Sequence, residues 1–441
     1  MTPLRSRPDC YVGVDLGTSG CRAIAIDRQG HSIAEARAAL PASRHPTPGA
    51  SEQDPQTWWP AITRVLGRLA SQASGRIRAI AVDGTSSTLL LCDEHGAPCS
   101  PALMYDDTRA RDQAQAIDAV APPDSPARGA GSALAKLLYL LEQAHDTTPA
   151  HALHQADWIA GRLGAGYGIA DENNVLKLGY DPVAGQWPAW LQAFPMVPPL
   201  LPEVRPVGGV TGWIAPEVAA SLGLPDDVLL VAGTTDSNAA TLAAGISQAG
   251  DAVTSLGSTL VLKIYSDHPI ASARYGVYSH RIGGRWLAGG ASNSGGAVLR
   301  QFFSDTELTA LSKRIDPDRP TGLDYYPLPG IGERFPFSDP DRQPRMQPRP
   351  ASDHAFLQGL FEGIAAIEAA GYHRLADLGA PYPRRVLSSG GGAKNRVWQR
   401  IRARALGVPV VPAMHGEAAY GTALLARAAI VNDAADPRGR G

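Results

Sequence analysis

The sequence contains little cysteine and almost no surplus charge. Only four cysteines, Cys10, Cys21, Cys92 and Cys99, occur in 441 residues, and no two of them form a CxxC pair. This spacing does not fit a zinc site or a disulfide framework, so we expect reduced thiols in a cytoplasmic protein. The formal net charge of −2 leaves no basic excess for binding nucleic acid or an anionic membrane surface.

Long hydrophobic runs are missing as well. The sequence has no continuous apolar run of about 18 residues, so we expect no membrane-spanning helix. The first ten residues, MTPLRSRPDC, carry arginines but no apolar core of a signal peptide. The hydrophobic content of 44% and the charged content of 19% are ordinary for a globular protein. The expected partners are therefore small molecules.

The length and the order of expected elements predict two α/β domains. A chain of 441 residues is too long for one hydrophobic core, and strands alternate with helices along it. We expect a first domain over 8–245 and a second over 250–430. Strands are expected within 11–40, 77–84, 87–96, 252–265 and 275–290, and helices over 56–72, 130–145, 151–163 and 353–376. A strand, a polar turn and a helix are expected within each of 226–245 and 384–407, and a last helix over 416–430.

One short pattern occurs twice, about half a chain apart. The stretch YVGVDLGTSGCRAIAID begins at Tyr11, and AVTSLGSTLVLKIYSD begins at Ala252. Both read as a strand, a turn with glycine and two hydroxyls, and a second strand, which is the signature of a β-hairpin. When the two are aligned, Asp15 falls on Ser255. Because only the first copy has the acid, we interpret the pair as parts of a site built by two similar halves.

The two turns have the composition of an anion site. Turns with glycine can direct several backbone N–H groups at one anion, and hydroxyls add donors. Asp15, at the end of its strand, suits a magnesium ion held partly through water. Neither turn matches the P-loop pattern. The alternative is an ordinary polar hairpin, in which such residues are common.

Asp236 stands between an expected strand and an expected helix, in VAGTTDSNAATLAAG. A polar residue here commonly caps the helix. The start of a helix also favours an ionised carboxylate, which is the form that a general base for a sugar hydroxyl needs. Both interpretations stay open at this point.

Three further segments are polar or rich in glycine or proline. VDGTSSTLLLCD places Asp83, Thr85, Ser86, Ser87 and Thr88 at a strand end, where they form either a ligand loop or an ordinary turn. The Gly390–Gly392 turn in LSSGGGAKN does not match the dinucleotide fingerprint but allows a flat base to lie against the backbone. The proline-rich segment 325–350 is either a flexible linker or, given Ile331, Phe335 and Phe337, a packed one.

The segment MYDDTRARDQ combines aromatic, acidic and basic residues. Asp107 and Arg109 lie close to Tyr105 in the sequence. Taken alone, this pattern is typical of a surface ion pair that contributes little to stability.

Together these segments resemble the FGGY carbohydrate kinases of the actin, Hsp70 and sugar kinase superfamily. The resemblance covers about 11–430, with the motifs in the family's order: VGVDLGTSG, MYDDTRA (with Tyr105 in place of tryptophan), AGTTDSNAA, SLGST, PGIGERFPFSDP, SSGGGAKN and GEAAYGTALLA. The resemblance implies two RNase H-like domains with ATP in a central cleft. It also implies that the proline-rich segment is part of the fold.

The resemblance also implies roles for individual residues. Asp236 would be the catalytic base, and Asp15 would hold Mg²⁺ and help to place the γ-phosphate. Asp15, Ser86, Ser87 and Asp236 would contact the sugar. The nucleotide would be bound by Gly17, Thr18, Ser19, Gly257, Ser258, Thr259, Gly391, Gly392 and Asn395.

Within the family, DGTSSTLLLCD is most similar to the D-ribulose kinases of cyanobacteria and plants. Xylulose kinases read G-Q-M-H-G in this loop, with a histidine where this chain has Ser87, and glycerol kinases place Arg and Glu there. We therefore expect phosphorylation of D-ribulose, with a xylulokinase or polyol kinase as the alternative. A non-catalytic nucleotide switch or sugar sensor would lack the sugar-side loop and the base. The sequence leaves open a monomer or a homodimer.

Overall fold

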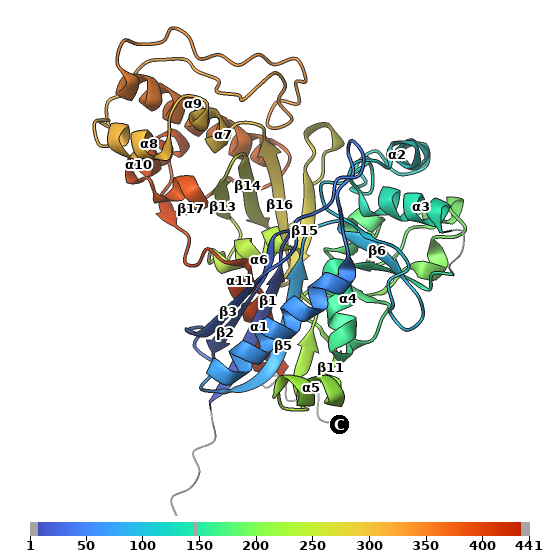
Figure 1. The fold of residues 1–441 in the computed structure, drawn as a ribbon. Coiled ribbons are helices and arrows are strands. Elements are labelled where there is room, and N and C mark those ends of the chain that lie inside the picture. Colours follow the sequence, from blue (N-terminus) through green and yellow to red (C-terminus); the bar gives the residue numbers. More distant parts are fainter. Residues whose placement is uncertain (1–7, 145–147, 434–441) are drawn as a thin grey trace, which may run out of the picture. The chain divides into compact units, whose positions relative to one another are not determined.

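The computed structural model describes residues 8–144 and 148–433, and Figure 1 shows its fold. The chain forms two compact units. The first unit comprises Met1–Ala243 and Glu417–Gly441, and the second comprises Ala244–Gly416. The chain thus returns to the first unit at Glu417, whereas the expected division had kept 416–430 in the second domain.

The first unit is built on a six-stranded sheet with the order β11-β12-β5-β1-β2-β3. Within it β1 is antiparallel to β2 and parallel to β5. A second sheet of four short strands has the order β4-β7-β6-β8, and β9 pairs with β10. The strands are β1 (Asp9–Leu16), β2 (Gly20–Asp27), β3 (Ser32–Ala39), β4 (Glu52–Gln53), β5 (Arg76–Gly84), β6 (Leu89–Cys92), β7 (Ala102–Leu103), β8 (His151–His154), β9 (Ile169–Asp171), β10 (Glu203–Arg205), β11 (Val210–Trp213) and β12 (Leu229–Val231).

Helices cover both faces of the large sheet. Alternate residues of β1 point to opposite faces: Val12 and Val14 join a core with α1, whereas Tyr11 joins a core with α11. At Gly13 a side chain would collide with the α11 backbone, so this glycine allows close packing. The helices are α1 (Trp58–Gln72), α2 (Arg111–Asp118), α3 (Ala133–Gln143), α4 (Gln155–Ala160), α5 (Pro216–Leu222), α6 (Asp236–Ala243) and α11 (Ala418–Asp433).

The second unit has a six-stranded sheet with the order β15-β16-β14-β13-β17-β18. Its strands are β13 (Asp251–Leu256), β14 (Leu260–Ser266), β15 (Tyr278–Ile282), β16 (Arg285–Ser292), β17 (Arg385–Ser389) and β18 (Val410–Pro412). Its helices are α7 (Gly296–Arg300), α8 (Asp305–Ser312), α9 (Asp353–Asp377) and α10 (Arg396–Leu406). Residues of α9 and α10 form one hydrophobic core with β14.

Two details differ from the sequence-based expectations. The helix expected over 151–163 begins instead as strand β8, because His151–His154 pairs with β6, and only Gln155 onward is helical. In the proline-rich segment Phe335 is fully buried, but Ile331 is 66% exposed. The segment therefore packs, as expected, although Ile331 does not contribute to that packing.

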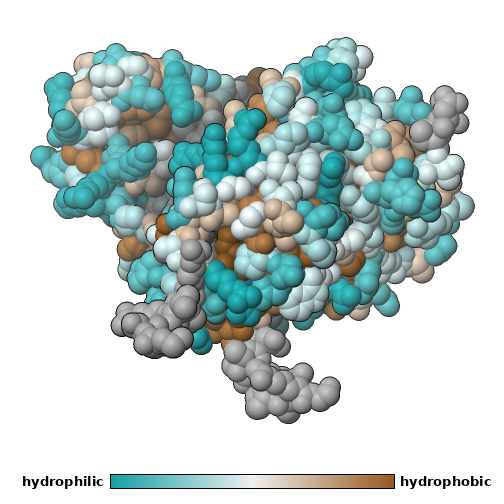
Figure 2. All heavy atoms as spheres, turned by 60° about the horizontal axis from the view of Figure 1, so that its bottom comes forward, coloured by the Kyte–Doolittle hydropathy of each residue, from teal (hydrophilic) through white to brown (hydrophobic). Residues whose placement is uncertain are grey.

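Within residues 8–144 and 148–433, no helix combines the length and the apolar character needed to cross a bilayer. On the face drawn in Figure 2, hydrophobic residues stand in small groups among hydrophilic ones.

Candidate active site

The first hairpin joins β1 to β2 through Gly17, Thr18 and Ser19. Gly17 N–H donates to the Gly20 carbonyl at 3.0 Å, and Gln53 Nε2 donates to the Thr18 carbonyl at 2.7 Å. The turn is therefore held by the fold itself. Gly17 has neither a left-handed φ nor a close neighbour that would exclude a side chain, so the chain alone does not require glycine there.

Three carboxylates interact electrostatically at the carboxyl ends of the first unit's strands. Asp15 on β1 lies opposite Asp83 on β5 in the parallel ladder. Burial raises the pKa of Asp15 to about 6, and the charge of Asp236 adds to this rise, while a hydrogen bond with Asp83 and the charge of Arg22 oppose it. The arrangement favours a bound cation or a shared proton.

Asp83 is the most enclosed of the three acids. Its side chain is fully buried, and burial, followed by the charge of Asp15, raises its pKa well above the usual range. Thr422 on α11 donates a hydrogen bond to Asp83 Oδ2. Asp83 Oδ1 has no partner among the described residues.

Asp236 is the first residue of α6, which follows β12 after the short segment 232–235. Its Oδ1 accepts a hydrogen bond from Ser237 N at 2.6 Å, so the carboxylate caps the start of its own helix. This bond is the kind expected of a capping residue, and the catalytic interpretation of Asp236 stays a prediction.

The polar loop after β5 contains a strained residue. Ser87 has a φ of 64°, a region that residues other than glycine, asparagine and aspartate rarely adopt. The Ser87 hydroxyl is buried and has no partner in the described part of the chain. Thr85 donates through its N–H and its hydroxyl to Gln155 Oε1, at 3.1 and 2.9 Å. This loop is therefore ordered by neighbours that the sequence pattern did not identify.

Several buried polar atoms near these strand ends lack partners within residues 8–144 and 148–433. They are Asp83 Oδ1, Ser87 Oγ, Gln155 Nε2 and Thr235 Oγ1. Gly84 and Thr235 form a parallel bridge, which brings the ends of β5 and the β12–α6 segment together. Buried polar groups are normally satisfied, so this set indicates places where a bound ligand or an ordered water would supply the missing partner.

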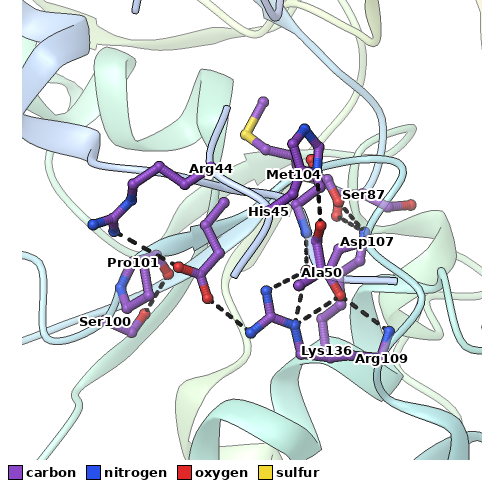
Figure 3. Close-up of polar contacts among 12 residues, drawn as sticks. Arg44, His45, Ala50, Ser87, Ser100, Pro101, Met104, Asp107, Arg109 and Lys136 are labelled. Atoms are coloured by element: carbon purple, nitrogen blue, oxygen red, sulfur yellow. Dashed lines mark hydrogen bonds and ion pairs between the residues drawn. The ribbon is translucent and has the colours of Figure 1, made fainter. Parts of the chain in front are cut away.

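Asp107 and Arg109 correct the sequence-based expectation of a surface ion pair. Asp107 is fully buried. It accepts hydrogen bonds from Arg109 Nη2 at 2.6 Å and from Ser51 N at 2.8 Å, and Arg109 Nη1 also donates to Glu52 at 2.7 Å (Figure 3). The pair is therefore an internal brace that orders the loop before α2.

The second unit has its own hairpin and, beside it, a cavity. Gly257 N–H donates to the Thr259 carbonyl at 3.2 Å, and Gly296 N–H donates to the Gly257 carbonyl at 2.9 Å. A cavity of about 510 Å³ is lined by Gly257, Gly391, Gly392 and Asn395, together with Leu256, Gly296, Leu299, Arg300, Asp305, Leu308, Thr309, Ser312, Lys313, Phe361, Lys394, Arg396, Val397 and Trp398. This volume lies in the range of cofactor sites.

The chemistry of the cavity suits a flat anionic ligand. Phe361 and Trp398 stack with ring centroids 4.6 Å apart, and four cationic side chains and one carboxylate line the walls. Asn395 caps α10 through Trp398 N at 3.0 Å and donates to Ser312 Oγ at 2.7 Å.

Comparison with known proteins decides the family. The N-terminal domain of the FGGY family of carbohydrate kinases matches residues 10–243, and its C-terminal domain matches residues 252–430. The chain belongs to the FGGY family of carbohydrate kinases. As an FGGY kinase it uses ATP to phosphorylate a carbohydrate.

Individual FGGY relatives agree with this assignment. The xylulose kinase of Escherichia coli (strain K12) is 26% identical over 414 residues, which is 89% of this chain and 84% of the relative. The autoinducer-2 kinase of Yersinia enterocolitica is 26% identical and covers 95% of this chain and 86% of its own. The crystal structure of xylulose kinase from Rhodospirillum rubrum superposes with a TM-score of 0.82 at 24% identity, over 98% of this chain and 91% of that one. The expected fold of two RNase H-like domains is confirmed.

The residues that the sequence analysis predicts for the site divide between the two units. The first unit holds Gly17, Thr18, Ser19, Asp15, Asp236 and the loop with Ser86 and Ser87. The second unit holds Gly257, Ser258, Thr259, Gly391, Gly392 and Asn395, of which Ser258 and Thr259 do not line the cavity.

Sequence reasoning missed three neighbours of these residues, Gln155, Thr422 and Lys136, which come from distant helices and left no local signal. It did name Asp83 among the polar residues at a strand end, but it did not predict that Asp83 lies opposite Asp15.

Proposed function

We propose that this kinase transfers the γ-phosphate of ATP to the terminal hydroxyl of a ketopentose, with D-ribulose as the preferred substrate and D-ribulose 5-phosphate as the product. The observation that carries the proposal is the set of unsatisfied buried polar atoms around Asp83, Ser87, Gln155 and Thr235. A polyhydroxyl ligand offers both the donors and the acceptors that this set requires.

In this proposal Asp236 accepts the proton of the attacking hydroxyl, while the fold orients the hydroxyl for attack. A general base contributes mostly by position in phosphoryl transfer, and the start of α6 gives Asp236 a fixed place. Ser86 and Ser87 contact the sugar from the loop after β5. Asp15 joins them from the neighbouring strand.

The glycines of both hairpins support phosphate binding. Gly17 and Gly257 have ordinary backbone conformations and room for a side chain, so close approach of a ligand is the remaining physical reason for glycine there. Thr18, Ser19, Ser258 and Thr259 supply hydroxyl donors to the phosphates. Gly391, Gly392 and Asn395 would border the adenosine.

Asp15 could supply one of the ligands of a magnesium ion. No three acidic, histidine or cysteine side chains among the described residues lie close enough to form a complete metal site. Mg²⁺ commonly uses one or two carboxylates together with water and substrate phosphates. We assign Asp15 as its carboxylate ligand; when bound, the metal would neutralise phosphate charge.

D-Xylulose is the second candidate substrate, since several relatives are named xylulose kinases. The two sugars differ in configuration at C3. A site that pairs a substrate hydroxyl discriminates against an isomer that leaves buried partners unsatisfied. We expect D-ribulose to have a kcat/KM roughly 10- to 100-fold higher, which corresponds to the loss of one or two hydrogen bonds.

The test is an ATP-consumption assay with D-ribulose, D-xylulose, ribitol, arabinitol, glycerol and erythritol, with the product position determined by NMR. Replacing Ser87→His should narrow the gap between ribulose and xylulose or abolish activity. Faster turnover of xylulose by the unmodified chain would overturn the ribulose assignment. If the chain phosphorylates neither D-ribulose nor D-xylulose, the proposal of a ketopentose substrate is wrong as a whole.

A further inference from the structure

Lys136, on α3, is unusual because its lysine side chain is completely buried. Lysine is rarely buried unless its ammonium group is paired. Here Nζ donates to the Ser87 carbonyl at 2.9 Å and to the Met104 carbonyl at 2.6 Å (Figure 3). Burial lowers the pKa of Lys136 to about 7, so keeping this group inside has a free-energy cost that the fold tolerates.

The first of these carbonyls belongs to the strained serine. Ser87 and Ser338 are the two residues other than glycine with a positive φ in the described part of the chain. A left-handed conformation costs an L-residue roughly 1–2 kcal/mol, and it persists only where the surroundings fix it. Lys136 fixes the Ser87 carbonyl, and with it the strained backbone from which the unsatisfied Ser87 hydroxyl projects.

The second carbonyl belongs to a rigid loop. Asp107 N–H donates to the same Met104 carbonyl at 3.0 Å, and the buried Asp107 is held in turn by Arg109 and Ser51. Tyr105, which follows Met104, is 51% exposed. Lys136 therefore connects the strained loop that contains Ser87 to the loop that contains Met104 and the exposed Tyr105.

We propose that Lys136 is a positioning residue for the sugar, which sets the Ser87 hydroxyl relative to the loop of Tyr105 by holding the Ser87 and Met104 carbonyls. The inference rests on the proposed function, because it takes the Ser87 loop as the sugar side. It assigns Lys136 no contact with ATP and no part in the proton transfer.

The test compares Lys136→Met with the unmodified chain and with Lys177→Met, a control that removes a nearby lysine on another element. Methionine keeps the length and the apolar stem but donates no hydrogen bond. We expect the KM for D-ribulose to rise by about 10-fold or more, as the loss of buried, charge-assisted bonds implies. The KM for ATP should stay within about twofold, and the preference for ribulose over xylulose should shrink.

The outcomes separate positioning from a purely structural role. An unchanged ribulose KM, or equal changes in the KM values for ribulose and ATP, would overturn the proposal. If Lys136→Met gives no soluble protein, Lys136→Gln serves instead: its shorter, uncharged side chain cannot reach both carbonyls as lysine does, so the ribulose KM should rise while the ATP KM stays within about twofold, and equal values for the variant and the unmodified chain would overturn the proposal. If the unmodified chain phosphorylates no pentulose, the proposed function is wrong. The role of Lys136 is then tested by measuring the KM of the variant for the sugar that the chain does phosphorylate.

Discussion

The two hairpins have the same strand pairing and different chemistry. In the first unit the strands run β12-β5-β1-β2-β3, and in the second they run β18-β17-β13-β14-β16. At equivalent places in the parallel ladder, Asp15 lies opposite Asp83, whereas Ser255 lies opposite Ser389. One copy of the scaffold thus holds a pair of acids, and the other holds a pair of hydroxyls.

This difference gives the two hairpins different roles in the function that we propose. Burial, together with the charge of Asp236, raises the pKa of Asp15 to about 6, which makes the first hairpin suited to a cation. The serine pair has no charge to place near a polyphosphate. A scaffold used twice can therefore bind phosphate at both turns, while only one copy serves the metal and the sugar.

The largest expected effect concerns Asp236, the proposed catalytic base, which belongs to the first unit. Replacing Asp236→Asn keeps the size of the side chain and removes its ability to accept a proton. We expect kcat to fall by about 10²–10⁴-fold, with ATP binding retained in a titration with a non-hydrolysable analogue. A variant with more than about half of the original kcat would remove Asp236 from this role.

A smaller but more direct effect breaks the hairpin comparison itself. Replacing Asp15→Ala should lower kcat by at least about 10²–10³-fold, the size typical of losing one electrostatic stabiliser of the transition state. It should also weaken the dependence of the rate on Mg²⁺ concentration. The matched change Ser255→Ala should be mild. Equal losses in the two variants would mean that the asymmetry has no functional meaning.

The next prediction tests what the two hairpins share. Replacing Gly17→Ala or Gly257→Ala adds one methyl group where the ligand-free chain has room. We expect unchanged thermal unfolding and a KM for ATP raised about 10-fold, equivalent to roughly 1.4 kcal/mol. If the ATP KM stays constant in both variants, the turns do not approach the phosphates as proposed.

The sequence predicted these hairpins well because their information is local. A glycine turn between two apolar strands needs no distant partner to be recognised, and the same holds for the start of α6 at Asp236. The pattern was insufficient where a residue's environment is made by remote segments. The exposed-pair interpretation of Asp107 failed because Ser51 and Glu52 enclose the pair, and β8 was missed because its strand character depends on β6. Lys136 could not be singled out, since nothing near it in the sequence reveals two carbonyls from other loops.

The smallest expected effect concerns the pH dependence of stability. The first unit buries the amine of Lys136 as well as the acids Asp15 and Asp83. Burial lowers the pKa of Lys136 to about 7, against the opposing charges of Asp107 and Asp106, while Lys177 and Arg109 lower it further. An unfolded lysine has a pKa of about 10.4. Between pH 7 and about 10 the unfolded chain therefore binds more protons at this residue than the folded one.

It follows that the contribution of Lys136 to the free energy of unfolding rises with pH in this window, by at most about 1.4 kcal/mol per pH unit. Below pH 7 both states are protonated, and the cost of burying the charge is then fully present. Urea unfolding of the unmodified chain and of Lys136→Met, measured from pH 7 to 9.5, should show the steeper rise in the unmodified chain. The other titrating groups are common to both proteins and cancel in the difference. Parallel curves would mean that the ammonium stays charged in the folded state, stabilised fully by the carbonyls of Ser87 and Met104.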